Sequence, residues 1–208
     1  MLIKVCGMRD PDNIRAVEAL GVDMMGFIFW PHSRRYVGEK PAYLPQNCKR
    51  VGVFVDAAPE DILARCGEFG LDIIQLHGHE TPASISALRE KAAALRPGIR
   101  IVKSLSIKGA EDLAQTSAYD SVCDAFLFDA KGKLPGGNGL QFDWNVLRQY
   151  YGRIPFLLSG GIEPGEGQRI REFIVPGCIG VDLNSRFETA PGLKDVEALK
   201  AFIQTVRA

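Results

Sequence analysis

The stretch VGVFVDAAPEDILARCGEFGLDIIQLHGHETP, residues 51–82, holds one strand and helix followed by the start of the next pair. Val51–Val55 and Ile73–Leu76 are short, mostly apolar runs on consecutive positions, which is typical of parallel strands covered on both faces. Ala58-Pro59 and Thr81-Pro82 each place a proline where a helical pattern begins, and proline is favoured in the first turn of a helix. The stretch therefore predicts parallel strands joined by a helix.

The same alternation repeats along the whole chain. We expect eight strands, at Leu2–Cys6, Met25–Phe29, Val51–Val55, Ile73–Leu76, Ile99–Ser104, Ala125–Phe128, Pro155–Leu158 and Gly177–Val181. We expect the helices to begin near Asp10-Pro11, Pro41, Ala58-Pro59, Thr81-Pro82, Gly109, Asp143, Glu166 and Leu193, the fifth, seventh and eighth running over Gly109–Thr116, Glu166–Phe173 and Leu193–Val206. The segment Pro41–Lys49 holds two prolines and fits either a helix or only a short turn. Eight strand–helix pairs predict an α/β protein with one (β/α)8 barrel, a TIM barrel of parallel strands, as a single domain over residues 1–208.

The composition narrows the class of protein and its partners. The chain has 25 Lys and Arg against 25 Asp and Glu, and 46% of its residues are hydrophobic, which excludes disorder and leaves no basic surface for nucleic acid. The first residues lack the pattern of a signal peptide, and the apolar stretch Met24–Pro31 is too short to span a bilayer. Five cysteines without a Cys-x-x-Cys pair suit a reducing compartment. We therefore expect a cytoplasmic protein with no membrane partner, disulfide framework or zinc site.

In a barrel of this type the chemistry lies at the carboxyl ends of the strands, so the residues after each run are the candidates. Cys6 ends the first strand and is followed by Gly7 and a helix start, where backbone dipoles and nearby cations favour a thiolate. Packing in the core is an equally good reason for a cysteine there. Asp129 ends the sixth apolar run, where a carboxylate is costly to bury unless it is used or paired. It is a candidate general acid or, alternatively, a cap, although the next helix start is as far away as Asp143.

Other strand ends carry groups that suit an anionic ligand. Ser159-Gly160-Gly161 and the stretch that holds Asn184 and Ser185 offer backbone N–H groups and a hydroxyl, which together favour a phosphate site. Arg35 could hold a carboxylate, or it could be a surface arginine. His77 suits a hydrogen bond at the site and His79 faces solvent, since no further ligands complete a metal shell around the pair. The glycines of Pro135–Gly139 allow close approach to a ligand.

Taken in order, these motifs resemble one family, the phosphoribosylanthranilate isomerases of tryptophan biosynthesis. The resemblance covers nearly the whole chain and is carried by Lys4-Val5-Cys6-Gly7, Gly26-Phe27-Ile28-Phe29, Ser33-x-Arg35-Tyr36-Val37, Val51-Gly52-Val53-Phe54, Gln75-Leu76-His77-Gly78, Asp129, Gly136-Gly137-Asn138-Gly139-x-x-Phe142-Asp143-Trp144, Ser159-Gly160-Gly161, Gly180-Val181-Asp182, and Glu188 with Lys194-Asp195. Each motif alone is weak, but the ordered set is highly specific.

The resemblance implies an enzyme that performs an Amadori rearrangement of N-(5-phosphoribosyl)anthranilate without a metal or a cofactor. It implies that Cys6 is the general base for the proton at C2′ and that Asp129 is the general acid for the ring oxygen. Arg35 matches the arginine that binds the anthranilate carboxylate, and Gly160, Gly161 and Ser185 fall in the phosphate site. Asn184 and Arg186 stand where the family usually has a serine and a glycine.

Two rival functions remain open from the sequence. A barrel isomerase of the histidine pathway would have an aspartate at the position of Cys6, and a non-catalytic sugar-phosphate binder would have no reason to keep a thiol and a carboxyl at opposite strand ends. In each case the expected partner is a small phosphorylated molecule. The chain length suits a free-standing barrel, either a monomer or a homodimer.

Overall fold

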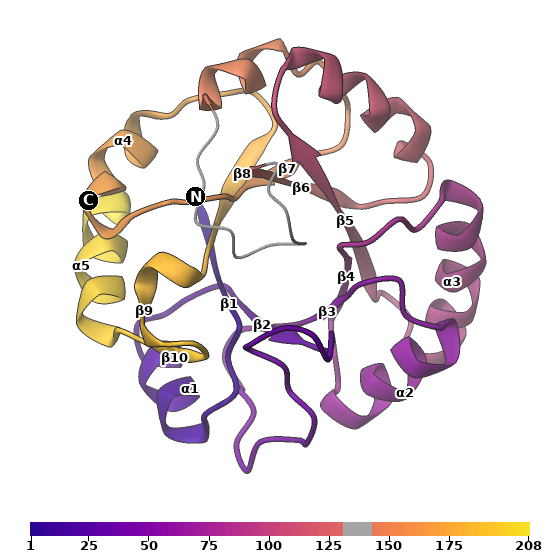
Figure 1. Ribbon diagram of the computed structural model, residues 1–208, viewed down its shortest axis with the longest axis horizontal. Helices are drawn as coiled ribbons and strands as arrows, with labels where there is room; N and C mark the ends of the chain where they lie inside the picture. The colour runs from indigo at the N-terminus through magenta and orange to yellow at the C-terminus, as the bar shows by residue number, and fades with distance from the viewer. Residues whose placement is uncertain (131–142) are drawn as a thin grey trace.

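Eight parallel strands close into a barrel in chain order (Figure 1). The structure is a computed structural model that describes residues 1–130 and 143–208, so the segment Pro135–Gly139 lies outside the described residues. The strands of the barrel are β1 (Leu2–Cys6), β2 (Met24–Ile28), β3 (Lys49–Phe54), β4 (Ile73–Leu76), β5 (Arg100–Ile107), β6 (Ala125–Ala130), β7 (Phe156–Leu158) and β8 (Cys178–Leu183). The predicted (β/α)8 fold class is therefore confirmed, with strand limits that differ from the predicted ones by at most three residues.

Closure depends on the pairing of the first strand with the last. Lys4 of β1 lies opposite Asp182 of β8, while Cys6 lies opposite Gly26 of β2. Because the side chains of a strand alternate between its two faces, Lys4 and Cys6 point to the same side. Cys6 belongs to an inner cluster within the ring of strands that also contains Val53 and Leu127, and Lys4 is buried on the same side.

The outer ring consists of helices and short 3-10 segments packed against the barrel (Figure 1). The α-helices are α1 (Pro11–Glu18), α2 (Pro59–Phe69), α3 (Pro82–Leu95), α4 (Gly167–Glu172) and α5 (Val196–Arg207), and the 3-10 helices are η1 (Ala110–Tyr119), η2 (Trp144–Gln149), η3 (Pro164–Glu166) and η4 (Ser185–Phe187). Asp10 and Thr81 cap α1 and α3 by accepting hydrogen bonds from Asn13 and Ser84. Within the described ranges, none of these helices has the length and apolar character needed to cross a bilayer.

The eighth predicted helix begins later than the sequence suggested. Leu193–Lys194 instead forms β10, a two-residue strand that pairs antiparallel with β9 (Glu188–Ala190). The helix starts only after Asp195, whose carboxylate accepts a hydrogen bond from the N–H of Ala198 and caps α5. The prediction of a helix from Leu193 was therefore wrong by three residues, and the missing turn is a hairpin next to the barrel rim.

Pro41–Lys49 forms no helix. Its backbone is held by a neighbouring helix, because the carboxylate of Glu18 on α1 accepts hydrogen bonds from the N–H groups of Gln46 and Asn47. Two prolines in the segment also remove N–H donors that a helix would need. The turn that the sequence left open as an alternative is the observed structure, so seven of the eight expected strand–helix pairs have a helical segment.

Two of the expected helices, at Gly109–Thr116 and after Asp143, are 3-10 helices rather than α-helices. In η1, the hydroxyls of Thr116 and Ser117 donate to carbonyl groups three residues earlier. Such local bonds compete with the regular α-helical pattern and suit a tighter turn. Helices therefore form at both predicted positions, and they are of the 3-10 type.

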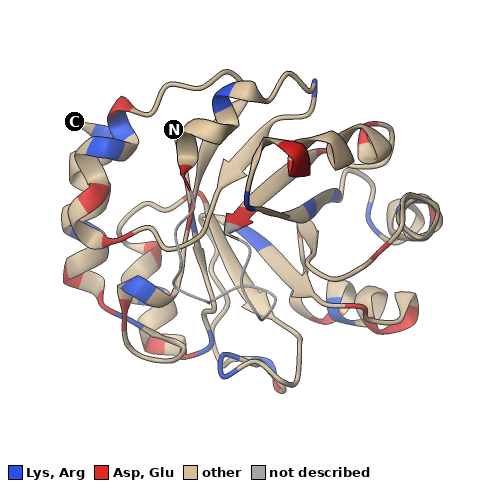
Figure 2. Ribbon diagram, turned by 45° about the horizontal axis from the view of Figure 1, so that its top comes forward, with Lys and Arg blue, Asp and Glu red and all other residues tan. Residues whose placement is uncertain are grey.

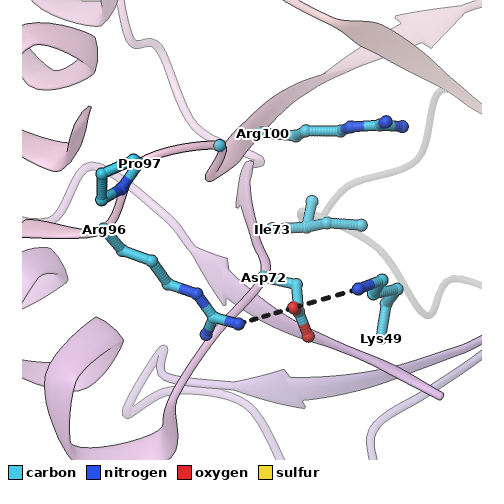
Figure 3. Close-up of a pocket in the computed structure, with 7 residues that line it drawn as sticks. Lys49, Asp72, Ile73, Arg96, Pro97 and Arg100 are labelled. Atoms are coloured by element: carbon cyan, nitrogen blue, oxygen red, sulfur yellow. Dashed lines mark hydrogen bonds and ion pairs between the residues drawn. The ribbon is translucent and has the colours of Figure 1, made fainter. Parts of the chain in front are cut away.

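A cavity of about 310 Å³ lies at the amino ends of β3, β4 and β5, on the side of the barrel away from Cys6 (Figure 3). Asp72 is held there by Arg96 at 2.8 Å and by Lys49 at 3.4 Å. Arg96 also donates to the carbonyl groups of Gly70 and Leu71, so its charge fastens the turn between α2 and β4. Elsewhere on the surface, Lys and Arg are interspersed with Asp and Glu (Figure 2).

Candidate active site

The predicted site residues all follow or end strands at the carboxyl rim of the barrel. Cys6 ends β1, Asp129 lies one residue before the end of β6, and Arg35 lies in the loop between β2 and β3. The remaining members come directly after β4, β7 and β8, and they are His77, Gly160, Gly161, Asn184 and Ser185. Since the strands are parallel and in ring order, these residues share one rim.

The thiol of Cys6 lies in a space that exists only because its neighbour is a glycine. A Cβ atom at Gly26 would lie 2.7 Å from the Cys6 sulfur and 3.2 Å from its Cα. Cys6 is 3% exposed, and burial raises the pKa of its thiol above the usual value, while the positive charge of Lys4 acts to lower it. The thiol therefore lies inside the wall of the barrel, beside a cation.

That cation belongs to a buried chain of charges. The Nζ of Lys4 lies 2.8 Å from Oδ1 of Asp182, and both side chains are buried inside the barrel. The second carboxylate oxygen of Asp182 accepts a hydrogen bond of 3.4 Å from the hydroxyl of Ser159, which follows β7. Lys4, Asp182 and Ser159 thus form a chain of contacts. It connects β1, which ends at Cys6, with the turn after β7, which holds Gly160.

Arg35 is held by a second buried cluster. Its Nε and Nη2 donate to the carboxylate of Glu188, which also pairs with Lys194 at 2.6 Å. Lys194 donates in turn to the side-chain oxygen of Asn184 at 2.8 Å. Burial alone would raise the pKa of Glu188, but the hydrogen bond from Arg35 and the charge of Lys194 bring it below the usual value. Glu188 is therefore a carboxylate that orients the guanidinium of Arg35.

Asp129 and His77 lie side by side. The Nε2 of His77 is 3.5 Å from Oδ2 of Asp129, and both side chains are largely buried. On its other side, Nδ1 of His77 is 3.4 Å from the amide nitrogen of Gln75, which itself donates to Ser104. Gln75 and His77 thus run from the barrel interior to the carboxyl of Asp129. His79 is 95% exposed and pairs with Asp56, in keeping with its predicted place in solvent.

The turn after β7 has a backbone that favours glycine at two consecutive positions. Gly160 and Gly161 have φ angles of 91° and 68°, in the left-handed region where side chains are strained. Ser185 begins the short helix η4 after β8, next to Asn184. Arg186 points elsewhere, with its Nε 3.6 Å from Glu163. The departure of Arg186 from the family pattern therefore brings an ion pair with the segment that follows β7.

Reasoning from the sequence gave no role to four charged residues at this site, which are Lys4, Asp182, Glu188 and Lys194. A lysine within the apolar run of β1 was a usable signal, because a lysine is almost never fully buried without a partner. Its partner could not be named before the pairing of β1 with β8 was known. Within residues 1–130 and 143–208, no group of three or more His, Cys, Asp or Glu side chains is placed to hold a metal ion.

Gly26→Ala is expected to lower kcat/KM by about tenfold to a hundredfold, because the added methyl group displaces the Cys6 thiol from the rim, and a misplacement of about 1 Å can cost that much. Steady-state kinetics of the variant and of the wild-type protein measure the effect. Gly67→Ala is the matched control, since a Cβ at Gly67 on α2 meets nothing within 4 Å. Wild-type kinetics in Gly26→Ala would show that the thiol has no fixed place in the reaction.

A closed parallel barrel with a thiol, a carboxyl and a guanidinium at its carboxyl rim defines a (β/α)8-barrel enzyme. A family model described as N-(5′-phosphoribosyl)anthranilate (PRA) isomerase matches residues 3–205. The chain belongs to the N-(5′-phosphoribosyl)anthranilate isomerase family and is therefore an isomerase, as the resemblance in its motifs implied.

Individual relatives agree over their full lengths. The N-(5′-phosphoribosyl)anthranilate isomerase of Phocaeicola vulgatus is 50% identical over 207 residues, covering 100% of this chain and 98% of the relative. The crystal structure of the Thermus thermophilus phosphoribosyl anthranilate isomerase has a TM-score of 0.82 at 27% identity, covering 100% of this chain and 98% of that one. Another structure of such an isomerase, in complex with reduced 1-(o-carboxyphenylamino)-1-deoxyribulose 5-phosphate, has a TM-score of 0.79 at 28% identity and the same coverage.

Proposed function

We propose that this chain converts N-(5′-phosphoribosyl)anthranilate into 1-(2-carboxyphenylamino)-1-deoxyribulose 5-phosphate in tryptophan biosynthesis, with Cys6 as general base and Asp129 as general acid. The observation that carries this proposal is the placing of two proton-transfer groups on inward-facing positions of β1 and β6, at one rim of the barrel. These strands are not neighbours in the ring, so the two groups can reach different atoms of one substrate.

The reaction needs two proton transfers that suit these residue types. Asp129 gives a proton to the ring oxygen of the ribose as the bond between that oxygen and C1′ breaks, which leaves an iminium at C1′. The iminium acidifies the C2′ hydrogen, and the thiolate of Cys6 removes it. The electron pair of that C–H bond forms an enolamine, which tautomerises to the ketone of the product. No cofactor is expected in this sequence of steps.

The remaining rim residues bind the two ends of the substrate. The backbone of Gly160 and Gly161, with Asn184 and Ser185, binds the phosphate, since N–H groups in such turns favour an anion. Arg35 binds the anthranilate carboxylate. Glu188 accepts hydrogen bonds from Nε and Nη2 of that guanidinium. The edge that carries Nη1 is therefore the one that would meet the substrate. His77 lies beside Asp129 and donates a hydrogen bond at the reacting end.

Adding phosphoribosylanthranilate to the purified protein, and following the fluorescence of the anthranilate group, tests the activity directly. We expect the fluorescence to change rapidly until all of the substrate has been converted to product. Conversion of the aminoaldose of histidine biosynthesis instead would favour the related barrel isomerases. Saturable binding without turnover would favour a sugar-phosphate binder.

The expected partners and location stay predictions. We expect a small phosphorylated substrate, no nucleic acid and no membrane, with the protein in the cytoplasm as a monomer or homodimer. Light scattering of the purified chain would give the oligomeric state.

A further inference from the structure

The Cys6 side chain faces two lysines and an aspartate inside the barrel, and no role has been given to these charges so far. Lys4 lies two residues earlier on β1, on the same face, and is 1% exposed against 3% for Cys6. Asp182 faces them from β8, and Lys194 from β10. A thiolate formed at Cys6 therefore has cations on two sides and one carboxylate nearby.

The position of the Lys4 ammonium is fixed by Asp182. Strand pairing places Lys4 opposite Asp182, and the resulting ion pair has an N···O distance of 2.8 Å. Burial acts to lower the pKa of Lys4, but attraction to Asp182 and to Cys6 outweighs it and raises the pKa above the usual value. Lys4 therefore keeps its charge throughout the neutral range, and it lies two residues before Cys6 on the same face of β1.

Lys194 is placed less directly. Its ammonium donates to Asn184 and pairs with Glu188, and a Cβ atom on Gly7, the residue after Cys6, would lie 3.0 Å from the side-chain oxygen of Asn184. Burial lowers the pKa of Lys194 below the usual value even though Glu188 and Cys6 act to raise it. Lys4 is thus the more firmly charged of the two lysines, and its charge lowers the pKa of the Cys6 thiol more than that of Lys194 does.

We propose that Lys4 is a positioning residue for the isomerase reaction: its ammonium, held in place by Asp182, is the counterion that stabilises the Cys6 thiolate. This role rests on the proposed function of Cys6 as the base. In the proposed step, the C2′ proton moves to the sulfur of Cys6 and the electron pair of the C–H bond moves towards the iminium. Lys4 gives up no proton, because it acts only through its charge.

The reactivity of the thiol tests this role without requiring turnover. Alkylation by iodoacetamide depends on the thiolate, so the rate at Cys6, followed by peptide mass spectrometry over a pH series, reports its ionisation. In Lys4→Met we expect this rate at pH 8 to fall by at least about tenfold, and in Lys4→Arg to stay within about threefold of wild type, since the charge is kept. Each of the other four cysteines lies at a different place in the chain, so peptide mass spectrometry follows Cys6 separately from them.

The direction in which a second variant changes the alkylation rate separates a charge effect from loosened packing. Asp182 carries a negative charge that faces Cys6, so Asp182→Asn is expected to speed alkylation while Lys4→Met slows it. Loosened packing would move both variants in the same direction. Should Lys4→Met not fold because Asp182 is left buried alone, the double variant Lys4→Met/Asp182→Asn removes both charges, and its Cys6 should still react more slowly than in wild type.

Lys103→Met is the matched control. Lys103 on β5 is another lysine buried to 2% exposure, paired with Glu80 at 3.0 Å, and Cys6 is not among its contacts. We expect it to leave the alkylation of Cys6 within about twofold of wild type. Wild-type alkylation in a folded Lys4→Met or double variant, or a loss in Lys103→Met of the same size, would overturn the role of Lys4.

Kinetics on the same variants separate this role from the proposed function itself. In Lys4→Met the pH at which kcat rises should move upwards, with little change in KM, because the loss is in ionisation of the base rather than in binding. If Cys6→Ala is fully active, the proposed base is wrong whatever Lys4 does to the thiol. If Cys6→Ala is inactive but Lys4→Met alkylates normally, only the inference about Lys4 fails.

Discussion

Replacing Cys6 by alanine is expected to lower kcat by at least about 10²-fold, the lower end of what a positioned acid or base contributes. The thiol is the group on β1 that faces the rim, and the space opposite it, at Gly26, is kept free for it. Binding should change much less, because the phosphate and carboxylate anchors lie on other loops. The reduced deoxyribulose phosphate seen with the structural relative is a suitable non-reacting ligand for calorimetry.

The pH dependence should show which ionisation is lost in Cys6→Ala. Burial raises the pKa of the Cys6 thiol, so the thiolate fraction, and with it the rate of the wild-type enzyme, should increase as the pH rises above neutral. That increase should be absent from the residual activity of Cys6→Ala. Cys6→Ser should be poor as well, since a hydroxyl ionises far less readily than a thiol.

Cys66→Ala is the control for losing a buried thiol without losing the base. Cys66 is buried on α2, in the layer between the helices and the barrel. The variant should therefore keep kcat within about twofold of wild type. Near-normal turnover in Cys6→Ala would make Cys6 a packing residue, and Asp10 and His77 would then be the next candidates for the base.

Asp129→Asn is expected to lower kcat by a similar factor, about 10²-fold or more, for a different reason. The amide keeps the shape of the side chain and its place 3.5 Å from His77, but it has no acidic proton to give to the ring oxygen. Ring opening should therefore become rate-limiting, and affinity for the reduced product should stay close to that of wild type. Single-turnover fluorescence measures the opening step and its loss.

Asp124→Asn provides a matched change at the other end of the same strand. Asp124 precedes β6, pairs with Arg89 at 2.8 Å and accepts a hydrogen bond from the N–H of Ile101. We expect this variant to lose some stability and to keep its kcat. Equal losses of kcat in the two variants would mean that Asp129, like Asp124, acts only on the stability of the strand.

The barrel could be predicted because its local signals agree with one another. Apolar runs bounded by helix starts such as Asp10-Pro11 and Thr81-Pro82 repeat through the chain, and local signals of this kind do not depend on tertiary contacts. The segment Pro41–Lys49 is different, since Glu18 on α1 decides its conformation. The start of α5 likewise depends on the pairing of β9 with β10, which forms next to the barrel rim.

The candidate site was predictable at single strand ends but not as a set of interacting groups. The motifs placed Cys6, Asp129 and Arg35 on the rim because each lies at the end of a strand or in the loop after one. The contacts that tune them join residues far apart in sequence, such as Arg35 with Glu188, and depend on how the ring closes. A charged residue inside an apolar run, as at Lys4, is the signal in the sequence that points to such a contact.

The antiparallel pair β9 and β10 has a consequence for how the enzyme comes into being. The thiol at residue 6 is synthesised well before Asp182, which holds Lys4, and before Lys194, which faces the thiol from β10. An amino-terminal portion of the chain, however well it collapses, cannot close β1 onto β8 or supply these charges. A nascent polypeptide that does not yet include β8 and β10 therefore lacks the charges proposed to act on the Cys6 thiol, and it gains them only when those strands are made.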